Sequence, residues 1–344
     1  MKRFVKRYFI DAMGAMALGL FASLLIGTIF GAIGMIPHLE IFATIGGFAK
    51  AMAGAAMGVA IAFSLKAHPL VMFSAAAVGY AANAQGGAGG PFAVFIIAII
   101  AVEIGMLVSK KTKIDIIVTP FITILVGGLL SLWIAPYIGT AVGYISKFIG
   151  WAALQAPLIT GLVVSVAVGM VLTLPLSSAA ICQGLVMTGS VLAAGSSEGL
   201  AIAGAAAVAG CCAQMVGFAV ISFKENRWGG LISQGLGTSM LQIGNIARKP
   251  IVWLAPTLAS AILGPISTCV LKMENSAAGA GMGTSGLVGP IGCWDTMSST
   301  TDHALLIAEI VGMYFVAPAL LSLLIHWGMK RLGWIKDGDL KLQR

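Results

Sequence analysis

Long apolar runs separated by short polar or basic segments dominate the chain. They cover approximately residues 10–35, 42–64, 69–82, 91–109, 114–136, 157–174, 177–195, 199–222, 250–271 and 303–327. Many of them contain 18 or more nearly uncharged residues, the length that crosses the core of a bilayer. The pattern therefore predicts an all-α polytopic membrane protein with about ten transmembrane helices. Two stretches, 137–151 and 228–246, are instead typical of amphipathic segments at the membrane interface.

Two glycine-rich segments interrupt the apolar pattern, one in each half of the chain. Asn83–Pro91 reads NAQGGAGGP, and Asn275–Pro290 reads NSAAGAGMGTSGLVGP. In transporters, Gly/Pro-interrupted segments in matching positions of two halves indicate the binding site, where broken helices expose backbone groups. We therefore predict two broken or re-entrant segments, with ordinary glycine-rich loops outside the bilayer as the alternative. The glycines expected to let the backbone approach a ligand are Gly87, Gly89, Gly279, Gly281 and Gly283.

Composition and charge support the membrane assignment. The chain is 59% hydrophobic and 9% charged, and its mean hydropathy is +1.00. The net charge of +8 comes from basic clusters between the apolar runs, which argues against a nucleic-acid partner. The positive-inside rule places these clusters and both termini in the cytoplasm. The clusters are Lys2–Arg7, Lys110–Lys113, Lys224–Arg227, Arg248–Lys249 and Lys330–Arg344.

The sequence contains no self-contained catalytic site. Gly279-Ala-Gly281-Met-Gly283 follows no strand, so it is not a dinucleotide fingerprint. The five cysteines form no CxxC pair, and we expect buried free thiols. No cofactor or metal is predicted.

Polar residues at the two glycine-rich segments are the candidate ligand-binding groups. Asn83 and Gln85 stand at the first segment, and Glu274 and Asn275 open the second. Carboxylates and carboxamides form paired hydrogen bonds with sugar hydroxyls. Three charged residues inside apolar runs, Glu103, Glu309 and Lys50, are a second set. Such residues face a cavity or a partner, so a proton site and an ion pair both remain open for them.

The region around the first segment carries a family resemblance. The run AFSLKAHPLVMFSAAAVGYAANAQGGAGGPFAVFIIAIIAVEIGMLVSKKTKIDIIVTPFITILVGGLL resembles the membrane (EIIC) subunits of the bacterial phosphotransferase system, in the fructose style. These subunits have a short motif with Asp, and His68 occupies its position here. Lys110–Lys113 occupy the position of the lysines that end a helix in these subunits. TLPLSSAAICQG resembles a second motif, with Ser177 and Ser178 in place of Asn-Lys. The chain as a whole resembles the compact branch that includes PfoR-type proteins. The family's Gly-Ile-Thr-Glu motif is absent, and Glu274 in KMEN stands in for its glutamate.

The resemblance implies a single integral-membrane domain of residues 1–344 in a bacterial inner membrane. It has halves of about 1–150 and 151–330, with 331–344 as a cytoplasmic tail. Such subunits are homodimers that bind a sugar or polyol near mid-membrane and move it by alternating access. A separate EIIB/EIIA phospho-carrier would phosphorylate the solute. His68, Ser177 and Ser178 then join the expected substrate site. Two alternatives stay open: a phosphorylation-independent transporter or facilitator using Glu103 or Glu309, and a PfoR-type membrane sensor.

Overall fold

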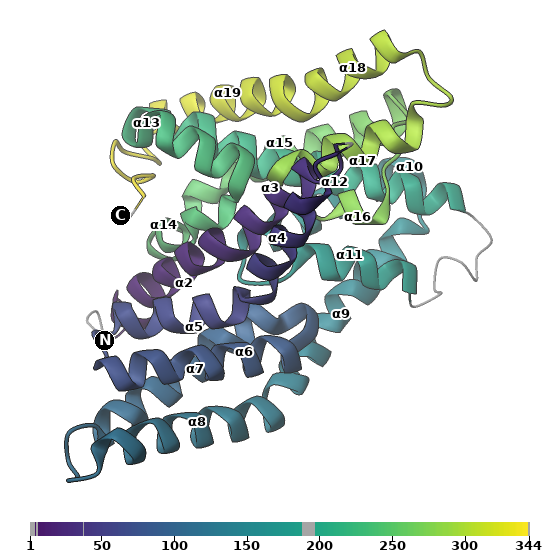
Figure 1. Ribbon diagram of the computed structural model, residues 1–344. Coiled ribbons are helices and arrows are strands. Elements are labelled where there is room, and N and C mark those ends of the chain that lie inside the picture. Colours follow the sequence, from purple (N-terminus) through teal and green to yellow (C-terminus); the bar gives the residue numbers. More distant parts are fainter. Residues whose placement is uncertain (1–3, 5, 37, 188–196, 343–344) are drawn as a thin grey trace. The chain divides into compact units, whose positions relative to one another are not determined.

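The computed structural model describes residue 4 and residues 6–36, 38–187 and 197–342. Every regular element in this part of the chain is a helix, which confirms the predicted all-α class (Figure 1). The chain divides into two compact units. Unit 1 contains Met1–Gly143 and Pro175–Ser177, and unit 2 contains Tyr144–Leu174 and Ser178–Arg344.

Unit 1 opens with a continuous apolar helical run. The run consists of η1 (Lys6–Ala12), α2 (Met13–Leu20), η2 (Phe21–Leu25) and α3 (Ile26–Ile33). The chain then folds back through α4 (Glu40–Ala51) and α5 (Ala53–Ser64), a pair bent by 47°. The next elements are α6 (Pro69–Gly86), η3 (Gly87–Gly89), α7 (Gly90–Val108) and α8 (Asp115–Trp133). α9 (Ala135–Ala153) begins in unit 1 and ends in unit 2.

The first glycine-rich segment is the turn of a helical hairpin. Pro69 opens α6, where a missing backbone N–H breaks no helical hydrogen bond. Gly87 ends the helix at φ 51°, a backbone region that residues with a side chain rarely occupy. α7 then packs against α6 (Figure 1). A Cβ on Gly90 would lie 2.6 Å from Asn83 Oδ1, so this tight return requires glycine.

Unit 2 is built around α12. Its elements are α10 (Pro157–Thr173), α11 (Ser178–Met187), α12 (Ser197–Ile221), α13 (Phe223–Ile232), η5 (Ser233–Gly237), η6 (Ser239–Gln242), α14 (Ile243–Arg248), η7 (Pro250–Trp253), α15 (Leu254–Pro265), η8 (Ile266–Val270), α16 (Ala277–Ala280), η9 (Ser285–Leu287), α17 (Val288–Met297), α18 (His303–Val311), η10 (Gly312–Val316) and α19 (Ala317–Arg331). α12 packs against α10, α15 and α19, and 94% of its most apolar stretch, within Ala201–Ile221, is buried. Its many Ala and Gly residues explain this burial, because small side chains let helix backbones approach closely. At Gly210, a Cβ would overlap the Ser165 carbonyl of α10.

Six helical runs of the described chain are long and apolar enough to cross a membrane. They are Lys6–Ile33, Pro69–Val108, Asp115–Ala153, Ala201–Ile221, Pro250–Val270 and His303–Arg331, and the bent pair α4–α5 makes a seventh. This number is below the predicted ten for physical reasons. Pro69–Val108 holds two of the predicted runs, folded back at Gly87, and α10 is an apolar helix of only 17 residues. The predicted run 177–195 begins with α11 and then continues outside the described residues.

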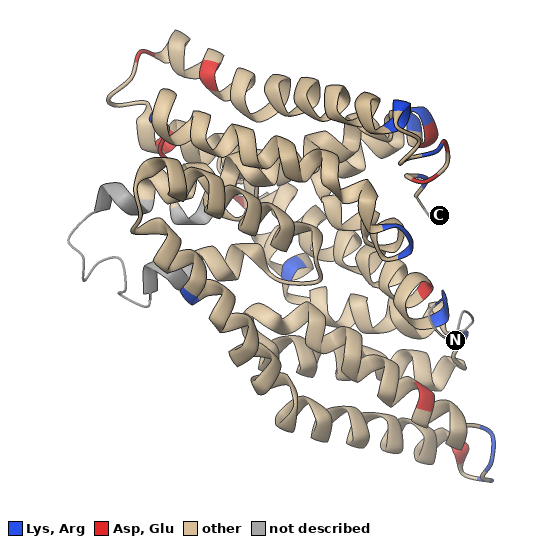
Figure 2. Cartoon of the chain, turned by 180° about the vertical axis from the view of Figure 1, so that it is seen from behind, with Lys and Arg blue, Asp and Glu red and all other residues tan. Residues whose placement is uncertain are grey.

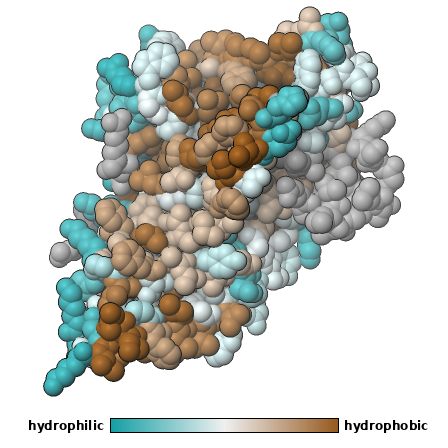
Figure 3. All heavy atoms as spheres, viewed as in Figure 1, coloured by the Kyte–Doolittle hydropathy of each residue, from teal (hydrophilic) through white to brown (hydrophobic). Residues whose placement is uncertain are grey.

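The two predicted interfacial segments have different structures. Residues 137–151 lie within the continuous helix α9. Residues 228–246 instead fold into short helices whose Gln234 and Gln242 side chains are fully buried. Figure 3 shows large apolar areas on the visible surface, and exposed residues such as Phe63, Phe73 and Trp133 lie on membrane-length helices. Exposed apolar side chains on this scale are typical of a lipid-facing protein.

Candidate functional site

The second glycine-rich segment is a break in the helical backbone of unit 2. η8 ends at Val270, and Lys272 then takes φ 48°, which turns the chain out of the helix. Residues 272–276 are non-helical, and α16 that follows has only four residues. The Asn275 N–H donates to the Ala201 carbonyl of α12 at 3.1 Å. The predicted broken segment is therefore present and is anchored to the core helix of the unit.

Asn275 is the central polar side chain of this break. It is 2% exposed, and its Nδ2 donates to the Gly289 carbonyl at 2.8 Å. Its Oδ1 has no hydrogen-bond partner among the described residues. A Cβ on Gly279 or Gly292 would collide with this oxygen, so two glycines make room for the carboxamide. A desolvated acceptor without a partner is costly and calls for a functional explanation.

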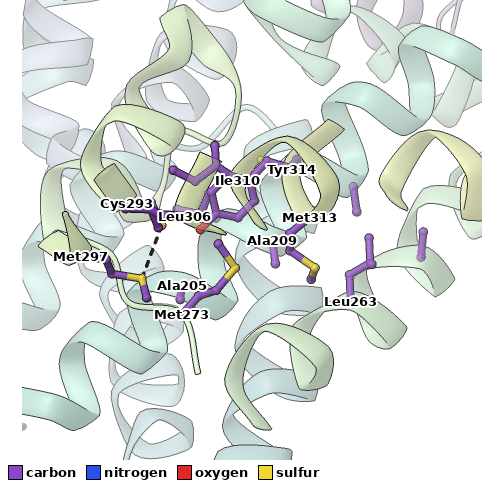
Figure 4. Packing of buried hydrophobic residues seen from close by; sticks show 14 residues of the cluster. Ala205, Ala209, Leu263, Met273, Cys293, Met297, Leu306, Ile310, Met313 and Tyr314 are labelled. Carbon is purple, nitrogen blue, oxygen red and sulfur yellow. Dashed lines mark hydrogen bonds between the residues drawn. The ribbon is translucent and has the colours of Figure 1, made fainter. Parts of the chain in front are cut away.

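Four further side chains complete a polar group around Asn275. Tyr314 of η10 is fully buried. Its hydroxyl lies close enough to the Cys293 and Asn275 side chains to interact with both, and Figure 4 shows it directed toward Cys293. The Glu274 and Glu309 carboxylates lie within electrostatic range of the Cys293 thiol. We call these five residues, Glu274, Asn275, Cys293, Glu309 and Tyr314, the Asn275 cluster.

The Asn275 cluster is rich in hydrogen-bond acceptors. Glu274 and Glu309 are half-buried, and neither forms an ion pair with a described residue. Apolar residues surround the cluster, including Met273, Leu306 and Met313 (Figure 4). The cluster therefore joins a carboxamide oxygen, a hydroxyl and two carboxylates in one region. Hydroxyl groups of a neutral solute are suitable partners for such a set.

The glycines after Asn275 serve packing within unit 2. Ser178 Oγ donates to the Gly281 carbonyl at 2.6 Å, and a Cβ on Gly281 would overlap the Ser178 backbone. Gly283 has φ 53° and lies against Cys211 of α12. The space beside Gly279, Gly281 and Gly283 is thus filled by protein atoms. Ser178 therefore lies against the second glycine-rich segment, and its predicted role in substrate binding stays a prediction.

The predicted residues of unit 1 do not form one group. Asn83 is half-buried and Gln85 is exposed, both near the end of α6. His68 precedes the first residue of the same helix, 15 positions earlier, which separates it from Asn83 by about 22 Å. There its Nδ1 lies 3.1 Å from Ser109 Oγ. Any site built on Asn83 and Gln85 therefore excludes His68.

The glycines of the first segment have unequal surroundings. Gly87 faces open space, whereas a Cβ on Gly89 would lie 3.1 Å from Ile138 Cγ2 of α9. Between them, the Ala88 carbonyl accepts a hydrogen bond from the Ser177 N–H at 2.9 Å. Ser177 therefore meets the first glycine-rich segment within unit 1, and Gly87 is the position where a ligand could approach the backbone.

Glu103 is engaged in an ion pair. Its Oε1 lies 2.6 Å from Arg7 Nη2 and accepts a hydrogen bond from Tyr8 at 2.7 Å. It also lines an apolar groove of about 420 Å³ with Phe9 and Phe95. Of the two interpretations of Glu103, the ion pair is the one observed. Lys50 is exposed, and its side chain runs beside Gly27 with no ion pair to a described residue.

Two members of the cluster were not predicted from the sequence. Cys293 and Tyr314 lie in apolar helices, where a cysteine or tyrosine is ordinarily a packing residue. The tyrosine in the run IVGMYFVA was the one sequence feature that could have indicated a polar site there, because a buried tyrosine hydroxyl normally needs a hydrogen-bond partner.

The helices and their exposed apolar surfaces define a multi-pass membrane protein with a polar cluster at a backbone break. The chain belongs to the family of membrane components described as phosphotransferase system, EIIC, whose model matches residues 10–342. The resemblance read from the sequence is thereby confirmed at the level of the family. No curated protein matches the chain.

Proposed function

We propose that this protein is the transport component of a phosphotransferase system, and that it binds a neutral sugar or polyol at the Asn275 cluster. The observation that carries the proposal is the buried Asn275 Oδ1, which has no hydrogen-bond partner among the described residues. Family membership supports a sugar-type solute. The broken backbone beside the cluster matches the way in which transporters form substrate sites.

The charge of the cluster favours a neutral solute over a phosphorylated one. Glu274 and Glu309 have no ion-pair partner among the described residues, so an incoming phosphate group would meet two carboxylates. Hydroxyl groups instead donate to carboxylates and to the Asn275 oxygen. We therefore propose that the solute binds unphosphorylated, and that a separate EIIB protein supplies the phosphoryl group.

The wider scheme is part of the same proposal. The protein would act as a homodimer in a bacterial inner membrane, with both termini in the cytoplasm, and alternate access by a rigid-body movement. A PfoR-type regulator would share the binding site but transport nothing.

One observation favours a second function, proton-coupled transport without phosphorylation. Glu309 lies on α18 without an ion-pair partner in the described part of the chain, and acidic residues inside membrane segments mark proton relays in pumps and transporters. Glu103 is a poorer candidate because its carboxylate is already engaged by Arg7 and Tyr8.

A thermal-shift screen of the detergent-purified protein against sugars, polyols and their phosphates tests the proposed site. We expect a neutral compound to raise the Tm, and its phosphate ester to have no effect. Glu274→Gln should weaken the affinity about ten- to a hundred-fold, since a hydrogen bond to a charged group contributes about 1.5–3 kcal/mol. The matched control Glu103→Gln should leave the affinity unchanged. Stabilisation by phosphate esters alone, or equal effects of the two variants, would contradict the proposal.

Uptake into vesicles separates the alternatives. Accumulation of phosphorylated solute only with an EIIB protein and a phosphoryl donor supports the main proposal. Uptake driven by a proton gradient alone supports the second function. Binding without any uptake would leave the sensor as the remaining role.

A further inference from the structure

Residues 335–342 lie as a docked peptide against α13, η6 and α14 of unit 2. The Leu340 carbonyl accepts hydrogen bonds from Asn226 Nδ2 at 2.9 Å and from Gln242 Nε2 at 3.1 Å. The Lys341 carbonyl accepts from Asn245 Nδ2 at 3.0 Å. Asn226 Oδ1 in turn accepts from the Leu342 N–H at 2.9 Å. Carboxamide side chains thus bind the peptide backbone, as a neighbouring strand would do.

Three of the buried carboxamides, Gln234, Gln242 and Asn245, hold one another in place. Gln234 Nε2 donates to Ser222 Oγ and to the Gly230 carbonyl, both at 2.9 Å. Gln234 Oε1 accepts from Gln242 at 2.8 Å, and Gln242 Oε1 accepts from Asn245 at 2.7 Å. All of these amides are buried. These bonds do not involve residues 335–342, so Gln234, Gln242 and Asn245 are positioned independently of the peptide, whereas the Asn226 side chain bonds to the peptide itself.

Side chains of the peptide add specificity. Ile335 and Leu340 are buried in an apolar cluster with residues such as Phe218 and Met329. Asp339 pairs with Lys249 at 2.6 Å. Asp337 pairs with Lys224 at 2.6 Å and also with Lys330. Figure 2 shows both acidic and basic residues near the end of the chain marked C. The site therefore recognises three features of a peptide: its backbone carbonyls, an apolar anchor and two acidic side chains.

We propose that this end of unit 2 is a binding site for turn-forming peptides that carry the sequence Asp-Gly-Asp-Leu, and that the chain's own residues 335–342 are its displaceable ligand. Release would uncover Lys224, Lys249 and Lys330 together with the carboxamides. The surface exposed in this way would suit an acidic segment of a partner protein. This inference does not depend on the solute that the Asn275 cluster binds.

Three features make the peptide displaceable. Its connection to α19 passes through Gly333 at φ 73°, and a second turn follows at Gly338 at φ 94°; both glycines face open space. The Lys224–Asp337 pair is more than half exposed, and exposed ion pairs contribute little to stability. The peptide belongs to no helix. Its retention therefore depends mainly on the Leu340 anchor and the backbone hydrogen bonds.

The test uses the full chain and a fluorescein-labelled synthetic peptide of residues 335–344, IKDGDLKLQR. In the wild type the covalent segment competes at a high effective concentration, so the free peptide should bind weakly. Leu340→Ala removes the anchor from the resident segment. We expect at least tenfold tighter peptide binding to this variant and faster tryptic cleavage after Lys336. A peptide with the same Leu-to-Ala change should bind at least tenfold more weakly.

Receptor variants control the test. In the Leu340→Ala background, Asn226→Ala should abolish peptide binding, whereas Gln155→Ala, which removes a carboxamide outside the site, should not. If Leu340→Ala fails to fold, the double variant Asp337→Asn and Asp339→Asn loosens the segment while keeping its anchor. Equal peptide affinity for wild type and loosened variants, binding that ignores Asn226, or unchanged tryptic cleavage would each overturn the proposal.

Discussion

Replacement of Asn275 by alanine distinguishes two roles of this residue, ligand binding and packing. The change removes one hydrogen bond, from Nδ2 to the Gly289 carbonyl, whose net contribution is about 0.5–1.5 kcal/mol. It also removes Oδ1, a buried acceptor without a partner among the described residues, whose desolvation costs about 1–3 kcal/mol. These two effects oppose each other. We therefore expect the free energy of unfolding to stay within about 1 kcal/mol of the wild type.

The affinity for the solute should respond quite differently. In the wild type, a solute hydroxyl that donates to Oδ1 removes the desolvation cost, and the alanine variant cannot gain this energy. The expected loss of about 1–3 kcal/mol corresponds to an affinity about five- to 150-fold weaker. The measurements are the Kd for the best sugar or polyol of the thermal-shift screen and the unfolding midpoint without ligand.

The matched control variant replaces another buried carboxamide, Gln214. Gln214 is also a buried carboxamide, but Trp253 Nε1 donates to its oxygen at 3.0 Å and its Nε2 donates to Thr257 at 3.2 Å. Gln214→Leu leaves these partners unpaired, so it should lower the stability by about 1–3 kcal/mol and leave the affinity unchanged. An unchanged affinity in Asn275→Ala, or a loss of stability as large as that of Gln214→Leu, would refute the assignment of Asn275 as a ligand group.

Three further predictions concern packing, the docked segment and topology. Gly210→Ala should lower the stability by about 1–3 kcal/mol, because its Cβ would overlap the Ser165 carbonyl. A Cβ on Gly128 would meet open space, so Gly128→Ala should be neutral or stabilise the protein by up to about 1 kcal/mol. Equal melting temperatures of the Gly210→Ala and Gly128→Ala variants would contradict this reasoning. The hydrogen bonds and charges of Lys224 and Lys330 hold the pKa of Asp337 at about 2, below its usual 3.8. The docked state therefore binds protons less readily than the released state. Hydrogen-exchange protection of the Leu342 amide should be constant above about pH 5 and fall as the pH approaches 2, with a flatter profile in Asp337→Asn. Finally, single cysteines placed beside Lys110–Lys113 or Lys224–Arg227 should resist an external thiol reagent in sealed cells; strong labelling would reverse the proposed orientation.

Hydrophobic patterning accounts for what was predictable about the fold. A run of about 20 apolar residues has few alternatives to a membrane helix, so spans such as 199–222 and 250–271 agree closely with Ala201–Ile221 and Pro250–Val270. The α6–α7 hairpin turns at Gly87, inside the first glycine-rich segment that the sequence predicts as a break. Apolar length does not reveal how a helix bends, however, and the α4–α5 bend divides what the sequence shows as one apolar run.

The candidate site was predictable where polarity breaks an apolar context. Glu274, Asn275 and Glu309 stood out because each is costly inside a membrane segment. That they gather around one buried thiol was decided by tertiary packing: η10 contacts α12 and α18, α17 contacts α18, and one apolar cluster joins the four helices. Chain spacing alone carries no information about such contacts.

The sequence by itself determined the class of this protein, its helices, its family and the positions of its two broken segments. These are local properties, fixed by apolar length, glycine content and short motifs. Only the tertiary structure decided that Glu103 is paired with Arg7, that His68 lies beside Ser109, and that residues 335–342 are docked against unit 2. Each of these outcomes depends on contacts between residues distant in the chain, and such contacts arise only when the helices pack.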